Sequence, residues 1–336
     1  MKPSTQYSET LDMLKREEFA HKLLDKIKEY DTIIIHRHKY PDPDAIGSQA
    51  GLGHLITELY PNKNVLLAGE LQGSLAQFAT MDTVSEKDYE NALVIIVDTA
   101  NKERIDGDYW DKGDYIIKID HHPSTPGEDY GDLEYVDTTY SSVGELLTIM
   151  FEEQVKYVQR CSNHSHSSKL LFLGVSGDTG HFNYTNTTSR TFHAASVLLE
   201  DTFTPETITS KLRSKSFKEM KLMGKVLDDM TMDNTGVIPM IISQEWLKEL
   251  DLTVSETDIV TNLPKNIDGA KIWTRCVELE DGSFKVSIRS NGITINDIAA
   301  KYNGGGHDVA SGAKVKDRQE LDSMISDLKD RAVGQY

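Results

Sequence analysis

Residues 32–48 (TIIIHRHKYPDPDAIGS) include three side chains that could bind a metal ion. His38, Asp42 and Asp44 have the spacing H-x3-D-x-D, so one imidazole and two carboxylates lie within seven residues. Such groups suit a hard or borderline divalent cation such as Mn²⁺. A polar loop in which Asp44 lies near a helix N-cap explains the same residues, so this motif alone leaves both interpretations open.

The residues on either side of this motif predict a strand and a helix. The β-branched run 32–35 is typical of a buried parallel strand, and AIGSQAGLGHLITEL (45–59) has the apolar spacing of a helix. An amphipathic helix over 17–30 is expected to lead into the strand. A strand, loop and helix in this order place the loop at the carboxyl edge of a parallel sheet, where α/β proteins bind ligands.

Three further apolar runs predict strands, and they cover 64–70, 92–100 and 114–122. The second run ends at Asp98, and the third ends at Asp120, His121 and His122. A capping Asp explains one such strand end but not three neighbouring ones, so the pattern favours a shared site. Because the runs are continuous rather than alternating, they indicate an α/β fold whose sheet is covered on both faces.

Helices follow in the middle of the chain, over 141–154, 167–182 and much of 189–231. The second of these carries Asp178 in a G-D-T-G setting. Residues 123–137 are predicted to form a loop. His164 and His166 have an H-x-H spacing that could bind metal, but their Ser and Asn neighbours favour a solvated loop.

The C-terminal part predicts a second domain. It begins with a strand over 236–243, and strands near 270–280 and 284–290 form a hairpin around Asp281 and Gly282. A helix then runs into a triple glycine, and a helix closes the chain. Residues 268–316 contain seven Lys/Arg and six Asp/Glu, a net charge of +1, whereas the whole chain carries −18. This relatively basic window suits the capture of a phosphate.

The composition excludes several classes of function. A net charge of −18 disfavours duplex DNA as a partner, because duplex binding requires many Lys and Arg contacts to phosphates. Small phosphate ligands remain compatible if metal ions supply positive charge. No apolar stretch is long enough to span a membrane and no signal peptide is recognisable, so we expect a cytoplasmic protein. Cys161 and Cys276 support neither a disulfide framework nor a zinc–thiolate site.

Six segments, taken in order, resemble the DHH phosphoesterase superfamily with a C-terminal DHHA1 domain: PDPDAIGS, VDTANKER, IDHHP, GDTGHF, SIRSN and GGGHDVASG. Within this superfamily the chain is most similar to the bifunctional nano-RNase and 3′-phosphoadenosine-5′-phosphate phosphatase group. The resemblance implies an N-terminal DHH domain (1–195, with 1–17 as a polar extension) and a mostly parallel sheet flanked by helices. A helical linker (196–232) and a smaller α/β DHHA1 domain with a mixed sheet (233–336) would follow.

The resemblance also implies two bound Mn²⁺ ions, with Mg²⁺ or another divalent cation as the alternative. The residues that match the family's ligands for the first ion are His38, Asp42 and Asp98. Those that match the ligands for the second ion are Asp44, Asp98, His121 and Asp178, so Asp98 would bridge. Four carboxylates balance the charge of two divalent ions, whereas without metal they would repel one another.

Other positions match residues that act around the metals. Asp120 would orient an imidazole, and His122 would lie beside the substrate phosphate and donate a proton to the leaving oxygen, so His122, Asp98 and His121 form the expected catalytic set. The residues that match substrate-binding positions are Arg104, Arg289, Ser290, Gly304, Gly305, Gly306 and His307. A surface ion pair for Arg104, and a simple helix stop for the glycines, are the alternatives. The sequence departs from the family pattern at Pro43 and His181.

The function implied is hydrolysis of short oligoribonucleotides to 5′-mononucleotides and dephosphorylation of 3′-phosphoadenosine 5′-phosphate. Hydroxide activated by two metals would attack phosphorus. The nearest alternative is a linear or cyclic dinucleotide phosphodiesterase acting on pApA or cyclic di-AMP. A RecJ-like exonuclease, a family II pyrophosphatase and a non-catalytic nucleotide sensor are less favoured. We expect no membrane partner, and the sequence leaves a homodimer open.

Overall fold

The computed structural model describes residues 5–71, 73–123, 129–161 and 165–334. The chain divides into two compact units, Met1–Arg213 and Ser214–Tyr336. The boundary between them lies inside the segment 196–232 that was predicted as a linker. Each unit has its own hydrophobic core and is described by itself.

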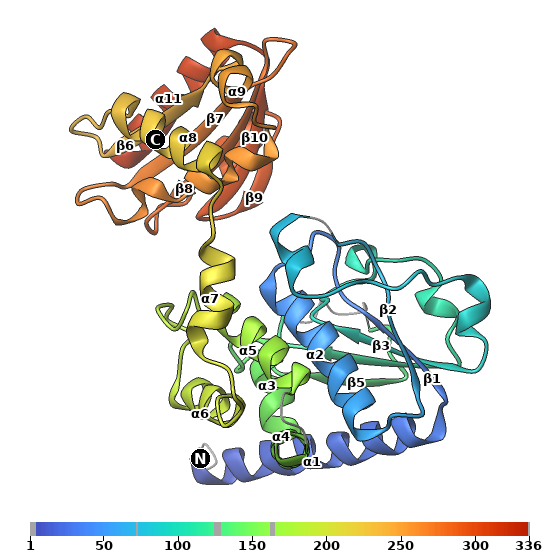
Figure 1. The fold of residues 1–336 in the computed structure, drawn as a ribbon. Helices are drawn as coiled ribbons and strands as arrows, with labels where there is room; N and C mark the ends of the chain where they lie inside the picture. The colour runs from blue at the N-terminus through green and yellow to red at the C-terminus, as the bar shows by residue number, and fades with distance from the viewer. Residues whose placement is uncertain (1–4, 72, 124–128, 162–164, 335–336) are drawn as a thin grey trace. The chain divides into compact units, whose positions relative to one another are not determined.

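The N-terminal unit is built on a sheet of five parallel strands (Figure 1). Their order is β2-β1-β3-β4-β5. The strands are β1 (Thr32–His36), β2 (Asn64–Leu67), β3 (Ala92–Val97), β4 (Tyr115–Asp120) and β5 (Leu133–Val136). The strand order reverses between β1 and β3, and ligands in open α/β sheets bind beyond the carboxyl ends of the strands at such a point.

Seven helices belong to the described part of this unit: α1 (Thr5–Glu29), α2 (Pro43–Leu59), α3 (Val143–Met150), α4 (Glu152–Cys161), α5 (His166–Asp178), α6 (Ser189–Leu198) and α7 (Pro205–Arg213). On one face of the sheet, Ile33 and Ile35 of β1 pack in the core that these helices form. The opposite face, which includes Ile34, is covered by short 3₁₀ segments. The sheet is therefore buried on both faces, as its continuous apolar runs predict.

Two local predictions for this unit were wrong. The helix predicted over 141–154 is divided at Phe151 between α3 and α4. The segment 123–137 is not entirely a loop, because β5 pairs with β4 through Ile117 and Leu133. The prediction that Asp44 lies near a helix N-cap is confirmed, because Asp44 lies in the first turn of α2, which begins at Pro43 after the N-cap Asp42. Proline is favoured at this position, since a helix leaves its first N–H groups without partners in any case.

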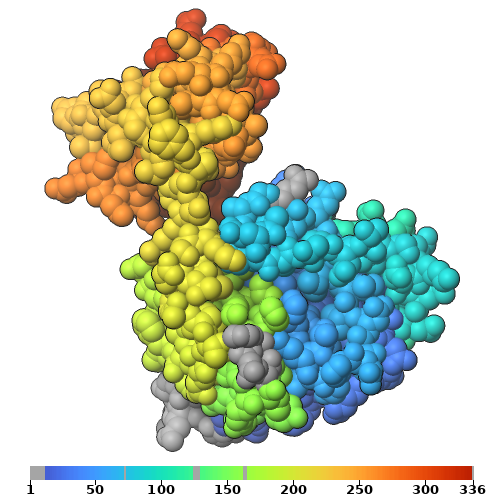
Figure 2. All heavy atoms as spheres, in the orientation of Figure 1, coloured from blue at the N-terminus to red at the C-terminus, as the bar shows by residue number. Residues whose placement is uncertain are grey.

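The helices α2 and α5 approach one another closely because glycines lie at their contact. A Cβ atom on Gly47 would lie 2.5 Å from the backbone nitrogen of Gly174. On the surface of this unit, the blue atoms of the early chain adjoin the green atoms of its middle part (Figure 2). This close approach brings the start of α2 to the end of α5, where Asp44 and Asp178 lie.

The C-terminal unit has a mixed five-stranded sheet with the order β6-β7-β8-β10-β9, in which β6 and β7 are parallel and the other pairs antiparallel. The strands are β6 (Val237–Ile242), β7 (Ile272–Glu278), β8 (Phe284–Ser290), β9 (Gly305–His307) and β10 (Ala310–Val315). The helices are α8 (Phe217–Asp229), α9 (Gln244–Leu250), α10 (Asn296–Lys301) and α11 (Arg318–Ala332). Residues of α10 and α11 pack in one core of this unit, and residues of α8 and α9 pack in the other.

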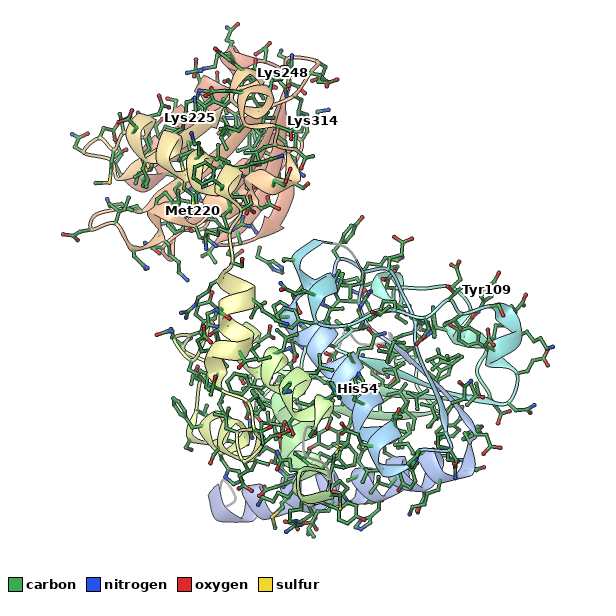
Figure 3. The ribbon with its side chains drawn as sticks, viewed as in Figure 1. His54, Tyr109, Met220, Lys225, Lys248 and Lys314 are labelled. Atoms are coloured by element: carbon green, nitrogen blue, oxygen red, sulfur yellow. The ribbon has the colours of Figure 1, made fainter. Side chains whose placement is uncertain are left out.

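Two segments of this unit differ from the predictions made from the sequence. The glycine triplet does not form a free loop, because Gly305 and Gly306 belong to β9 and pair with β10. The helix α8 lies within the predicted linker but packs on the C-terminal sheet. Its Lys225, which is labelled in Figure 3, forms an ion pair with Glu249 of α9 at 2.6 Å. Among the described residues, no helix has the length and apolarity that crossing a membrane requires.

Candidate metal centre

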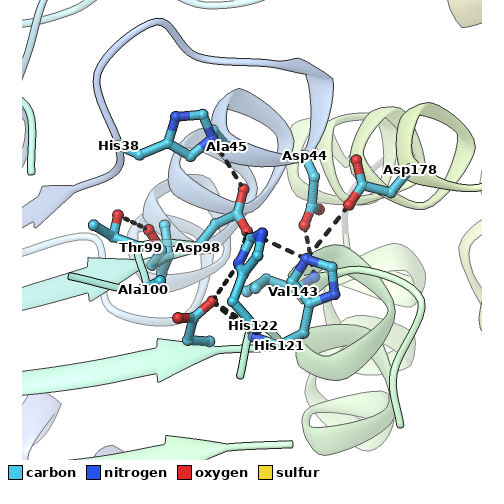
Figure 4. Close-up of polar contacts among 12 residues, drawn as sticks. His38, Asp44, Ala45, Asp98, Thr99, Ala100, His121, His122, Val143 and Asp178 are labelled. Carbon is cyan, nitrogen blue, oxygen red and sulfur yellow. Dashed lines mark hydrogen bonds and ion pairs between the residues drawn. The ribbon is translucent and has the colours of Figure 1, made fainter. Parts of the chain in front are cut away.

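Five segments converge beyond the carboxyl ends of β1, β3 and β4 (Figure 4). The loop after β1 supplies His38 and Asp42, and Asp44 lies in the first turn of α2. Asp98 directly follows β3, while β4 ends at Asp120 and is followed by His121 and His122. Asp178 is the last residue of α5. Parallel pairing places these strand ends at one edge of the sheet, so residues up to 140 positions apart lie together.

Two groups of side chains in this region could each hold a metal ion, with ligand atoms within 4.8 Å of one another. The first contains His38, Asp42 and Asp98. The His38 Nε2 atom lies 3.5 Å from an oxygen of Asp98 and 3.7 Å from one of Asp42. Asp42 has its other oxygen occupied as the N-cap of α2, where it accepts from the backbone N–H groups of residues 44 and 45.

The second group contains Asp44, His121 and Asp178. The His121 Nε2 atom lies 3.4 Å from an oxygen of Asp178 and 3.4 Å from one of Asp98. Asp98 therefore adjoins both groups, and the structure brings all six predicted ligands together. A third group of potential ligands adds His122, whose Nδ1 atom lies 3.5 Å from Asp98.

The hydrogen bonds of the two imidazoles leave the correct nitrogen atoms facing the centre. His38 Nδ1–H donates to the carbonyl of Lys39 at 2.8 Å, and His121 Nδ1–H donates to the carbonyl of Tyr140 at 3.2 Å. When the rings are neutral, both Nε2 atoms carry a lone pair. Such a partner on the other ring nitrogen is the usual arrangement for a metal-binding histidine.

Buried atoms without partners also fit a cation. Asp98 Oδ1 and His121 Nε2 are buried and have no hydrogen-bond partner among the described residues. Buried polar atoms are normally satisfied, so two unsatisfied atoms at a cluster of carboxylates fit a site that can bind a cation. The donor set of imidazoles and carboxylates matches a divalent cation such as Mn²⁺.

The electrostatics of the cluster favour positive charge. Burial and neighbouring carboxylates together raise the pKa of Asp44, and they raise the pKa of Asp178 to about 7. Burial alone would lower the pKa of His38 and His121, but their carboxylate partners raise both to about 10. For Asp98, attraction to these two imidazoles, at 3.4 and 3.5 Å, outweighs burial and lowers its pKa. Protons on the two imidazoles thus hold positions that metal ions could take.

Asp120 orients His122 rather than His121. One Asp120 oxygen accepts from His122 Nδ1 at 2.9 Å and from the backbone N–H groups of both histidines. The buried Lys118, which sequence analysis did not identify, lies 4.0 Å from the other Asp120 oxygen and donates to the carbonyl of Ala100. A lysine inside an apolar strand indicates that some partner is needed, because a buried charge requires one, but it does not indicate which residue that partner is.

The remaining predicted residues lie in two places. Arg104 is exposed in a 3₁₀ segment, with its Nη2 atom 3.4 Å from His38 Nδ1. The other predicted substrate-binding residues belong to the C-terminal unit and lie on or beside β8 and β9: Arg289, Ser290, Gly304, Gly305, Gly306 and His307. Burial and the nearby Arg275 lower the pKa of Arg289. Because β10 pairs with both β8 and β9, these residues lie on neighbouring strands of one sheet.

The H-x-H pair contributes to no metal-binding group among the described residues. His164 lies outside the described part of the chain. His166 is not in a loop but begins α5, and its ring stacks on His54 with the centroids 5.3 Å apart. His181, at the position that departs from the family pattern, lies 2.8 Å from the Ser176 hydroxyl through its Nδ1 atom.

Two family descriptions match the chain. The DHH family N-terminal domain matches residues 32–175, and the DHHA1 domain matches residues 236–334. The chain therefore belongs to the DHH phosphoesterase family and carries a DHHA1 domain at its C-terminal end. It is a hydrolase that acts on phosphate ester bonds.

The chain is similar to curated proteins over nearly their whole length. It is 44% identical to the "Probable bifunctional oligoribonuclease and PAP phosphatase NrnA" of Streptococcus mutans, over 91% of this chain and 97% of that protein. It is 38% identical to the "Bifunctional oligoribonuclease and PAP phosphatase NrnA" of Bacillus subtilis, over 91% and 96%. These similarities confirm the predicted resemblance.

More distant similarities reach other proteins. The "Cyclic-di-AMP phosphodiesterase GdpP" of Geobacillus thermodenitrificans is 27% identical over 92% of this chain, but the match covers 49% of that protein. The solved structure of an exopolyphosphatase-related protein from Bacteroides fragilis has a TM-score of 0.78 at 23% identity, covering 94% of this chain and 98% of that one. It confirms the α/β fold.

Proposed function

We propose that the protein is a Mn²⁺-dependent phosphoesterase that degrades short oligoribonucleotides to 5′-mononucleotides and dephosphorylates 3′-phosphoadenosine 5′-phosphate. This proposal rests on one observation: two groups of potential metal ligands lie next to each other, and Asp98 lies close to both. The names of the two relatives at 44% and 38% identity support the choice of substrates. Residues 268–316 carry a net charge of +1 in a chain that carries −18, and this relatively basic window agrees with small phosphate substrates.

The residues of the chain would hold two divalent ions, one at each group. When bound, such ions act as Lewis acids toward phosphoryl oxygens and generate a nucleophile from water at neutral pH. Asp98 would be shared between the two positions, because its oxygens face both His38 and His121. The buried setting of Asp98 and Asp44 would keep these carboxylates in place, which is required for preorganised stabilisation of charge.

His122 is suited to move a proton to the leaving oxygen. Its Nδ1–H group donates to Asp120, so Nε2 remains available, and its side chain is 38% exposed. The Asp120 carboxylate would stabilise the ring when it is charged, and the same bond fixes the ring's orientation. A histidine held in this way is a typical general acid.

The C-terminal unit would bind the part of the substrate that does not react. Arg289 can hold a phosphate with two donors, and the backbone of β9 at Gly305 is open to a ligand because no heavy atom lies within 4 Å of a Cβ placed there. The exposed His307 ends the same strand.

A dinucleotide phosphodiesterase is the second candidate. The similarity to a cyclic-di-AMP phosphodiesterase over 92% of this chain favours it, and its metal chemistry would be the same. A non-catalytic sensor would not need all six predicted ligands in one cluster.

The test is a substrate panel with Mn²⁺: a 5-mer RNA, pApA and 3′-phosphoadenosine 5′-phosphate. Asp98→Ala is the inactive control, and Asp322→Ala, at an exposed acid on α11, is the matched control for loss of a carboxylate. Turnover of all three substrates that is lost only in Asp98→Ala supports the proposal. Turnover of pApA alone moves the protein to dinucleotide metabolism, and full activity in Asp98→Ala or in EDTA contradicts the metal centre itself.

A further inference from the structure

One short loop, which we call the clamp loop (Thr139–Gly144), contacts two predicted metal ligands from different elements. The carbonyl of Tyr140 accepts the Nδ1–H bond of His121 at 3.2 Å. The first two backbone N–H groups of α3 donate to the two oxygens of Asp44, over 2.7 and 2.9 Å. The clamp loop therefore sets the direction of both side chains.

The clamp loop is also linked to the third ligand of the same group. The side-chain amide of Asn186 donates to the carbonyl of Asp178 at 3.1 Å and to the carbonyl of Ser141 at 3.3 Å. Each member of the second ligand group is thus linked to the clamp loop, Asp44 and His121 directly and Asp178 through Asn186. The first group has separate supports, because His38 is held by the carbonyl of its neighbour and Asp42 by the start of α2.

Arg190 of α6 holds the clamp loop from outside the ligand cluster. Its Nη2 atom donates to the carbonyl of Thr139, and its guanidinium carbon lies 3.6 Å from the centroid of the Tyr140 ring. Its Nε atom donates to Glu145 at 2.6 Å. A planar guanidinium can make these contacts together, which a lysine cannot.

Glu145 completes the support. Its side chain is fully buried, and Arg190 is its only ion-pair partner among the described residues. The other carboxylate oxygen accepts from the backbone N–H of Ser141 at 3.2 Å and from the hydroxyl of Thr191 at 2.9 Å. The ion pair therefore connects α6, α3 and the clamp loop in one buried network.

We propose that Arg190 is a positioning residue that sets the affinity of the Asp44–His121–Asp178 group for its metal ion, acting through the clamp loop. This inference rests on the proposed function, since it requires that the group binds a metal. It predicts a selective effect: loss of Arg190 weakens one ion and leaves the ion at His38, Asp42 and Asp98 in place. Changes in residues that support metal ligands weaken metal binding by about 10- to 100-fold.

The test is a titration of metal-free protein with Mn²⁺, followed by the electron paramagnetic resonance signal of the free ion. We expect the unaltered protein to bind two ions. Arg190→Met should bind one ion with unchanged affinity and the other about 10- to 100-fold more weakly. The matched control is Arg275→Met, which removes another arginine–carboxylate ion pair with one buried side chain, in the C-terminal unit, and should bind both ions normally.

Several outcomes overturn the inference. Unchanged binding of both ions in Arg190→Met, or equal weakening of both, would exclude a selective positioning role. If Arg190→Met does not fold, Arg190→Lys decides the question, because it keeps a charge beside Glu145 but loses the contacts with Thr139 and Tyr140. It should weaken the same single ion. If the unaltered protein fails to bind two ions, the proposed function fails, whereas normal binding in both Arg190 variants removes only this inference.

Discussion

Asp98 is the residue on which the whole site depends. It is 2% exposed, contacts three imidazoles and has a backbone φ of +52°. A left-handed conformation is unfavourable for most residues, although Asp tolerates it better than most. Its backbone N–H donates to the carbonyl of Ile119 at 3.0 Å, which continues the pairing of β3 with β4 just past the end of the strand. The residue is therefore fixed by the sheet.

Metal binding should release protons at neutral pH. The pKa of His38 and of His121 is about 10 in the metal-free protein, so both imidazoles are protonated at pH 7, and Asp178, with a pKa of about 7, is partly protonated. Metal ligands must be unprotonated. We expect release of about two to three protons when two ions bind, and an affinity that rises with pH.

Calorimetric titration in buffers of different ionisation enthalpy measures this number. The variant His38→Ala should release about one proton fewer and bind one ion more weakly. A heat of binding that is independent of the buffer would show that the ligands are already unprotonated and would contradict this electrostatic description.

At the scale of residues, the sequence predicted the side chains that form the cluster but not what holds them. His38, Asp98 and Asp178 could be identified because strand and helix ends carried unusual side chains in a recognisable order. The roles of the Tyr140 carbonyl and of Lys118 could not be predicted. Backbone groups leave no signal in the residue types, and the pairing of Lys118 with Asp120 depends on the geometry of the loop after β4.

At the scale of elements, the contact between α2 and α5 fixes the distance between two predicted ligands, Asp44 and Asp178. A Cβ on Gly174 would lie 2.4 Å from an oxygen of Asp44, too close to be accommodated without movement. We expect Gly174→Ala to destabilise the protein by roughly 1–3 kcal/mol and to weaken Mn²⁺ binding. Chemical denaturation and metal titration measure the two effects.

Gly224 provides the matched control for this change. It lies inside α8, and no heavy atom lies within 4 Å of a Cβ placed there. Gly224→Ala should stabilise the protein by up to about 1 kcal/mol, because alanine favours the helix, and should not affect metal binding. Equal stability changes of the same sign in both variants would contradict the packing interpretation.

Two glycines of the triplet, Gly304 and Gly305, are expected to have different roles. A Cβ on Gly304 would lie 2.0 Å from the carbonyl oxygen of Gly312, whereas Gly305 has open space. Gly304→Ala should therefore destabilise the C-terminal unit. Gly305→Ala should leave stability nearly unchanged but raise the KM for 3′-phosphoadenosine 5′-phosphate several-fold, if its backbone contacts the substrate. An unchanged KM would exclude β9 from substrate binding.

Strands with a clear apolar run were predictable, including the four-residue β2, whereas β5 and β9 were not. The runs that became β1, β3 and β4 have at least five residues and clear boundaries. The strands β5 and β9 have four and three residues and lie at sheet edges, where pairing with a neighbour decides the structure. Gly305 and Gly306 are strand residues because they pair with β10. Local propensity does not predict such a pairing, which depends on residues elsewhere in the sheet.

At the scale of the whole molecule, the two units have separate cores, so we expect them to respond differently to metal. Mn²⁺ binds only the folded N-terminal unit in this description, and at 100 times its dissociation constant an ion adds about 2.7 kcal/mol. Scanning calorimetry should show one transition raised by about 5–10 °C and one unchanged. In Asp98→Ala neither should move. A rise of both transitions would place a metal in the C-terminal unit.

The measurement that tests the central claim most directly is X-ray diffraction at the manganese absorption edge, from crystals grown with Mn²⁺. We predict two anomalous peaks about 3.5–4 Å apart. One should lie among His38, Asp42 and Asp98, and the other among Asp98, Asp44, His121 and Asp178. A single peak at this cluster would contradict the two-metal assignment, and the absence of any peak there would contradict the metal centre.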